Sequence, residues 1–140
     1  MHGIRVVVVH QIIQVQLTAL HFMLKIQQIM LAAAGGTRVA LLIQAAKRQY
    51  PQLAHRAPHA QHVIPNYLVT RFAEIHIRIP EWVARWIVSL PAAYHQVIHN
   101  AIAAQYPTQA GQTFTIHGRS VLRMLWELTN IYMRFPPVAA

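Results

Sequence analysis

The stretch IRVVVVHQIIQVQLTALHFMLKIQQIMLAAA, residues 4–34, decides the fold, because it runs without a proline or a glycine. Four leucines in it recur at helical intervals and so lie near one face of a helix. They are Leu17, Leu20, Leu24 and Leu31. Gly35-Gly36 follows, and glycine commonly ends a helix. The stretch therefore predicts a helix from about His10 to residue 34, while the β-branched run at 6–9 fits either a short strand or the first turn of that helix.

A second helix is expected directly after the glycines, from Thr37 to Tyr50. Thr37 is a suitable N-cap, and Pro51 cannot continue the helix. Residues 51–65, PQLAHRAPHAQHVIP, contain three prolines and three histidines and show no periodicity. This composition predicts an extended connector.

Four further helices are predicted between residues 66 and 135. Asn66 is the expected cap of the first, which runs to about Ile79. Pro80 and Pro91 are the expected first residues of the next two, which end near residues 90 and 106. A loop with a possible strand at 113–116 precedes the last helix, at about 119–135. The predicted fold class is all-α: a helical arm over residues 1–50, a connector over 51–65 and a helical bundle over 66–140.

The composition indicates a protein that covers much of its surface with a partner. Of the 140 residues, 55% are hydrophobic and only 11% are charged, which is too few charges to cover a monomer comfortably. Lys and Arg number 12 against three acids, giving a net charge of +9. Such an excess favours a polyanionic partner, and the preference for Arg suits phosphate oxygens. An assembly, a membrane surface or a nucleoprotein would each meet these demands.

Catalytic constellations are missing from the sequence. There is no Cys and no Asp, Ser occurs only at Ser89 and Ser120, and the three glutamates form no obvious pair. A nucleophilic triad and a carboxylate pair are therefore excluded. Gly35-Gly36 is not followed by the Lys-Ser/Thr of a phosphate-binding loop. We expect no enzyme activity and no cofactor. Residues 6–24 hold five strongly polar side chains, so no transmembrane helix is expected.

Cations without a nearby acid are the candidate nucleic-acid contacts. Arg38, Lys47, Arg48 and Arg56 cluster around the second helix and the connector. Uncompensated positive charge in a water-poor assembly is costly unless an anion meets it. Arg71 and Arg78, with Arg85, recur every seven residues and would share a helix face as a second phosphate-binding stripe; a solvated face is the alternative.

The ten histidines do not predict a metal site. His95 and His99 have the spacing of two ligands on one helix face, but the segment HQVIH lacks the glutamate of a zinc-hydrolase motif, and no third ligand is evident. They are expected to act as hydrogen-bonding groups. Trp82, Trp86 and Trp126 are expected to anchor the core or an interface.

The architecture resembles one known family. A basic, cysteine-free chain of this length, with a proline-free N-terminal helix ending at Gly35-Gly36, a connector between Pro51 and Pro65, and a C-terminal helical bundle, resembles the major capsid proteins of filamentous and rod-shaped archaeal DNA viruses. The resemblance covers the whole chain in architecture and includes no shared motif. It implies a virion protein whose copies, alone or with a paralogous coat protein, pair and wrap their helical arms around double-stranded DNA, beneath a lipid envelope in some members.

For this chain the resemblance places residues 4–50 around the DNA. It implies phosphate contacts for Lys25, Arg38, Lys47 and Arg48, with Arg56 following in the connector. Two other interpretations remain open from the sequence: an accessory subunit of a mitochondrial ribosome or respiratory complex, and a peripheral membrane protein with amphipathic helices.

Overall fold

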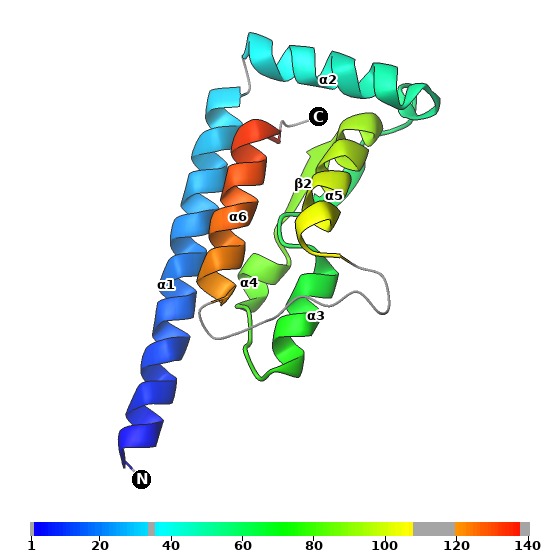
Figure 1. The fold of residues 1–140 in the computed structure, drawn as a ribbon. Coiled ribbons are helices and arrows are strands. Elements are labelled where there is room, and N and C mark those ends of the chain that lie inside the picture. The colour runs from blue at the N-terminus through cyan, green and yellow to red at the C-terminus, as the bar shows by residue number, and fades with distance from the viewer. Residues whose placement is uncertain (1, 34–35, 108–119, 138–140) are drawn as a thin grey trace.

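The computed structural model describes the backbone of residues 2–33, 36–107 and 120–137, with side chains over 16–32, 36–107 and 121–137. Its elements in chain order are α1 (His2–Ala33), α2 (Thr37–Gln49), the 3-10 turn η1 (Pro51–Leu53), β1 (His59–His62), α3 (Asn66–Glu74), α4 (Glu81–Ala84), β2 (Ile87–Leu90), α5 (Ala92–Gln105) and α6 (Ser120–Arg134) (Figure 1). The described chain is mostly helical, as predicted. The possible strand at 113–116 lies outside the described residues.

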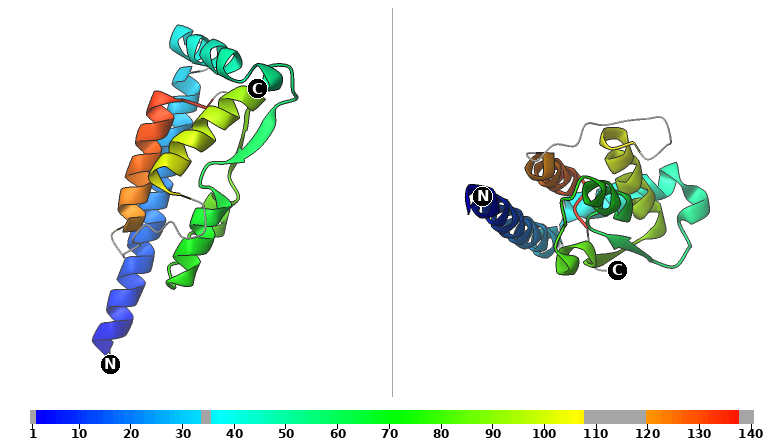
Figure 2. Two further views of the ribbon diagram at one scale, coloured as in Figure 1. Left: turned by 45° about the vertical axis from the view of Figure 1, so that its right-hand side comes forward. Right: turned by 90° about the horizontal axis from the view of Figure 1, so that it is seen from below.

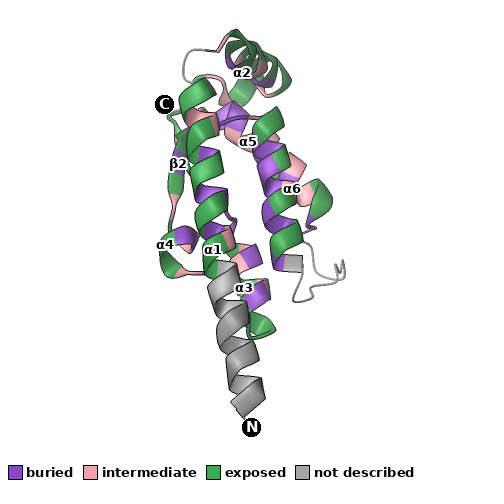
Figure 3. Cartoon of the chain, turned by 90° about the vertical axis from the view of Figure 1, so that its left-hand side faces the viewer, coloured by how far each residue is buried: buried purple, intermediate pink, exposed green. Residues whose placement is uncertain are grey.

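Helix α1 is continuous from His2, so the β-branched run at 6–9 belongs to the helix and not to a strand. It packs lengthwise against α6, and its N-terminal part extends past the rest of the molecule (Figures 1 and 2). Ala19, Phe22, Met23 and Ile26 face the core. The leucine face seen in the sequence is on the outer side of α1, opposite these residues (Figure 3).

Prolines precede three of the helices. Pro65, Pro80 and Pro91 have φ between −52° and −55° and extended ψ, and each carbonyl accepts a backbone hydrogen bond from the helix that follows. A fixed φ and a missing N–H are tolerated at this boundary. The sequence located these starts to within one residue. The capping residues differ, however: Pro65, and not Asn66, precedes α3, and Gly36, and not Thr37, precedes α2.

Helix α3 ends at Glu74, well before the predicted Ile79. His76 has φ of 63°, in the left-handed region. The His76 N–H donates to the Ala73 carbonyl, and the Ile77 N–H donates to the Phe72 carbonyl, at 3.0 and 2.9 Å. This pair of bonds is the Schellman motif, which satisfies the last carbonyls of a helix and turns the chain away from its axis.

The structure contains a two-stranded sheet, which the all-α prediction did not include. Strand β1 lies within residues 51–65, where an extended connector was predicted. Strands β1 and β2 pair antiparallel, with His59 opposite Leu90 and His62 opposite Ile87. β2 replaces the end of the predicted helix at 80–90, of which only α4 remains. Its side chains alternate, with Val88 and Leu90 buried and Ile87 and Ser89 exposed, so period two prevails over helical spacing here.

One core unites these elements. Its fully buried large side chains come from α1, α3, α5, α6 and the residues beside β1 and β2. Tyr94 of α5 and Tyr132 of α6 are the largest of them. α2 crosses the end of the molecule at 90° to α1 and packs on α5 (Figure 2). The segments predicted as arm, connector and bundle all contribute side chains to this core.

Two of the predicted aromatic anchors are not in the core. Trp82 on α4 is 51% exposed and Trp126 on α6 is 67% exposed, whereas Trp86 is half-buried against the core. Both side chains keep more than half of their surface exposed in the described structure, so they are available to a partner.

Candidate nucleic-acid interface

The α2 helix carries the main group of predicted phosphate contacts. Val39 and Ala46 are buried on one side of it, which fixes the opposite side towards solvent. Arg38, Lys47 and Arg48 are exposed. Arg38 stands at the first turn of α2, at the edge of a shallow cavity of about 300 Å³ formed where α2 meets α1 and α6. Lys47 and Arg48 occupy the last turn, where the helix dipole favours cations.

Arg56 joins them through the turn that follows. The Leu53 N–H bonds to the Tyr50 carbonyl, and the Arg56 N–H bonds to the Leu53 carbonyl, so the chain coils tightly at the end of α2. Arg56 is exposed. We call Arg38, Lys47, Arg48 and Arg56 the cationic end of the molecule, because α2 and its following turn form one end of the structure (Figure 1).

No described acid neutralises the cationic end. The two salt bridges among the described residues join Arg85 to Glu81, at 2.6 Å, and Arg123 to Glu127, at 2.8 Å. Both are surface pairs on single helices. The charges of α2 and its turn therefore remain available to an external anion.

The other predicted contacts lie elsewhere. Lys25 is exposed on α1, Arg71 is half-buried on α3, and Arg78 is exposed in the segment after α3. α3 lies at the opposite end of the molecule from α2 (Figure 1). The predicted stripe of Arg71, Arg78 and Arg85 is wrong, because α3 ends at Glu74 and the left-handed turn breaks the shared helix face.

A second polar feature crosses the interior between β1, α5 and α6. His59 and His95 approach each other with their Nδ1 atoms 3.1 Å apart. Gln61 Nε2 donates to the Tyr132 hydroxyl at 2.9 Å, and that hydroxyl donates to the Val63 carbonyl at 2.7 Å. Gln61 is 3% exposed and Tyr132 is fully buried. These bonds fix the orientation of the Gln61 amide, since the Tyr132 oxygen accepts from its nitrogen.

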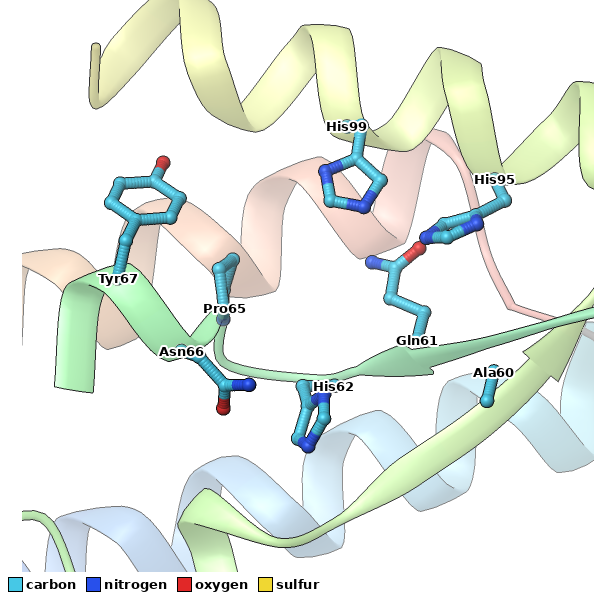
Figure 4. A pocket seen from close by; sticks show the side chains of 8 residues that line it. All are labelled: Ala60, Gln61, His62, Pro65, Asn66, Tyr67, His95 and His99. Carbon is cyan, nitrogen blue, oxygen red and sulfur yellow. The ribbon is translucent and has the colours of Figure 1, made fainter. Parts of the chain in front are cut away.

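Gln61 Oε1 and His95 Nε2 are both buried without a hydrogen-bond partner. Figure 4 shows the Gln61 amide oxygen turned towards the His95 ring, in a cavity of about 270 Å³ that His99 and Tyr67 also line. Burial, with the nearby His99 and His59 rings, lowers the pKa of His95 to about 4, and burial lowers that of His99. A neutral His95 protonated on Nε2 would point its N–H at the Gln61 side and accept from His59 on Nδ1.

The sequence analysis missed the roles of His59 and Gln61. Their positions depend on the pairing of β1 with β2, which no local pattern predicted. The His95–His99 spacing was visible, and the two rings do lie together, with centroids 4.4 Å apart. Within the described residues, no group of three or more His or Glu side chains is arranged to hold a metal ion.

No protein-family model, curated protein or solved structure matches this chain. Within the described part of the chain, no single helix has the length and apolarity to cross a membrane; residues 16–32 and α2 pass that test only as a pair bent by 90°.

Proposed function

We propose that this protein is a structural coat protein, copies of which assemble along double-stranded DNA and package it without reading its sequence. The observation that carries the proposal is the cationic end, where four cations are presented from α2 and its turn with no described acid beside them. Non-specific packaging needs contacts to phosphate, and these contacts carry no sequence information.

The placement of the cations supports a backbone partner. Arg38 and Arg48 are ten residues apart on one helix, which separates their backbones by about 15 Å along the helix axis. That span matches several phosphates on one strand of a duplex. Guanidinium groups bind phosphate oxygens through a planar fork, and three of the four cations are Arg.

The overall composition supports a role in an assembly. With a net charge of +9 and large apolar side chains exposed on α1, α4 and α6, the monomer leaves both charge and apolar surface uncovered. A nucleoprotein coat would meet the charge with phosphate and the apolar surface with neighbouring copies. A ribosomal subunit or a peripheral membrane protein would also cover the apolar surface and the cations, so the binding measurements below have to separate these alternatives from a DNA coat.

Charge-removal variants test the proposal. Lys47→Gln/Arg48→Gln should lower the affinity for a random-sequence duplex on the order of 10-fold at 0.15 M salt, and should reduce the slope of log affinity against log salt by about 2. The reason is that two phosphate contacts, and the counterions they release, are lost. Fluorescence anisotropy over a salt series measures both quantities.

Arg78→Gln/Arg85→Gln is the matched control, since it removes the same formal charge from exposed positions between α3 and β2, away from the cationic end. It should leave the slope nearly unchanged. Equal losses in the two double variants would mean that only net charge matters and would reject the assigned interface. Absence of DNA binding by the unmodified protein at low salt would reject the proposed function itself.

A further inference from the structure

The outer face of α1 is an apolar strip with no described partner. Its four leucines are substantially exposed: Leu17 53%, Leu20 42%, Leu24 48% and Leu31 75%. They follow one another at three, four and seven residues, so they form a narrow band along a single helix. The opposite face of α1 is the one that enters the core.

The spacing of this strip is that of a helix-pairing seam. With Gln27 included, the positions 17, 20, 24, 27 and 31 alternate steps of three and four, as a and d positions of a heptad do. In the sequence, the same alternation continues towards the N-terminus through Ile13, His10 and Val6, of which Ile13 and Val6 are apolar. From Val6 to Leu31 the seam would measure about 38 Å.

We infer that the leucine strip of α1 pairs with the same strip of a second copy of this chain, forming a two-fold symmetric dimer. A stripe of leucines at heptad spacing is self-complementary, which is what an isologous interface requires. The pairing deepens the proposed function by naming a contact between coat subunits, but it does not need DNA.

The low number of charged residues on α1 favours this helix over other surfaces as the contact between two copies of the chain. Each copy carries a net charge of +9, so most pairings of two copies bring cations together. α1 contains only two cations, Arg5 and Lys25, in 32 residues, and no acid. An anionic or strongly charged protein partner would find almost no opposite charge on this helix. A second uncharged strip, in contrast, can pack against it without leaving charges unpaired.

The available area is sufficient for a stable dimer. Two helices in contact over about 38 Å bury on the order of 1,000 Å² in total, which is near the lower limit for specific interfaces. α1 also extends past the rest of the molecule at its N-terminal end, so a second helix can approach it there without obstruction from the described body (Figure 1).

Sedimentation equilibrium without DNA tests the inference. The unmodified chain should be dimeric at micromolar concentration, and Leu20→Glu/Leu24→Glu should weaken the dimer 100-fold or more. Gln44→Glu/Gln49→Glu adds the same charge to exposed positions of α2 and should leave the dimer intact. Circular dichroism verifies that both variants stay folded, as expected because all four side chains are exposed.

A cysteine variant gives a second, independent measurement, because the chain has no Cys. Leu20→Cys, close to the midpoint of the seam and therefore near its own copy in a parallel or an antiparallel pair, should oxidise to a covalent dimer at least ten times faster than Gln44→Cys. A monomeric protein, or equal rates for the two cysteines, overturns the inference. So does a monomer that binds neutral phosphatidylcholine vesicles through the same leucines, since the strip would then face lipid. A dimer that fails to bind DNA would sustain this inference while removing the proposed function.

Discussion

At the residue scale, His95 is the side chain with the most perturbed surroundings. It lies between His59 and His99 and faces the buried amide of Gln61, with no carboxylate recorded against it in the described structure. A positive charge there would be desolvated, and the two titratable groups beside it, His59 and His99, would repel it when protonated. The folded protein therefore keeps His95 neutral, with a pKa near 4 in place of 6.5.

This gives a pH dependence of stability with a definite sign. Because the pKa of His95 is lower in the folded chain, the unfolded chain binds the proton first as pH falls. The free energy of unfolding should be greatest above pH 6.5 and should decrease between about pH 6.5 and pH 4. Partial solvent exposure reduces the loss to the order of 1 kcal/mol.

Urea unfolding at pH 7.5 and pH 5 measures this loss. His95→Gln should flatten the difference between the two pH values, leaving the smaller contribution of His99, whose pKa burial also lowers. Identical pH dependence in the unmodified chain and in His95→Gln would show that His95 is not the responsible group.

Residue-scale roles were the hardest to predict from the sequence. The neutral form expected for His95 and His99 agrees with their lowered pKa values, whereas the hydrogen-bonding surface role expected for His95 does not fit its buried, unpartnered Nε2. The buried bond from Gln61 to Tyr132 spans 71 residues, and nothing local in either segment signals it. A glutamine in a proline-rich stretch is ordinarily solvent-exposed, so its burial follows only from the strand pairing.

At the element scale, the turn that ends α3 holds His76 in an unfavourable backbone conformation. His76 adopts φ of 63°, where a β-carbon is disfavoured and glycine is not. His76→Gly should raise the free energy of unfolding by about 0.5–1 kcal/mol, because the Schellman bonds stay and the steric cost is removed.

His76→Ala is the matched comparison for this prediction. Alanine keeps the β-carbon and should give none of the gain, while it also removes the exposed imidazole. Thermal or urea unfolding of the two variants at pH 7.5 distinguishes them. A glycine variant no more stable than the alanine variant would contradict the role assigned to the left-handed turn.

Elements with strong local signals were predictable. The proline-free stretch predicted α1, Asn66 located the start of α3, and Pro80 and Pro91 located the starts of α4 and α5, each to within a residue. β1 and β2 were not predictable in the same way, since each has only four residues and the paired residues are 25 to 31 positions apart. The interval of seven between arginines was misleading, because it assumed one continuous helix across the turn at His76.

At the scale of the whole molecule, we propose a different binding partner for each of two surfaces. The cationic end on α2 faces phosphate, and the leucine strip on α1 faces a second copy. Because α2 is set at 90° to α1, the two surfaces belong to helices of different direction and need not compete for one partner. A dimer through α1 would carry two cationic ends.

The composition predicted the need for a covering partner, but it did not predict how the cations are distributed over the surface of the molecule. Arg71 and Arg78 lie away from α2, towards the other end of the molecule, so they are not part of the cationic end (Figure 1). Whether a residue joins a surface depends on tertiary packing of α3 and α5, which local periodicity does not encode. The proposed interface is accordingly narrower than the set first predicted.

Electron microscopy of the purified protein mixed with linear double-stranded DNA, with nuclease digestion in parallel, tests the coat proposal most directly. We predict regular filaments of constant width in which the DNA survives digestion at low salt, and loss of both filaments and protection when Lys47 and Arg48 are replaced by Gln. Irregular aggregates or no particles, with DNA digested as fast as free DNA, would contradict the proposal that this protein coats DNA.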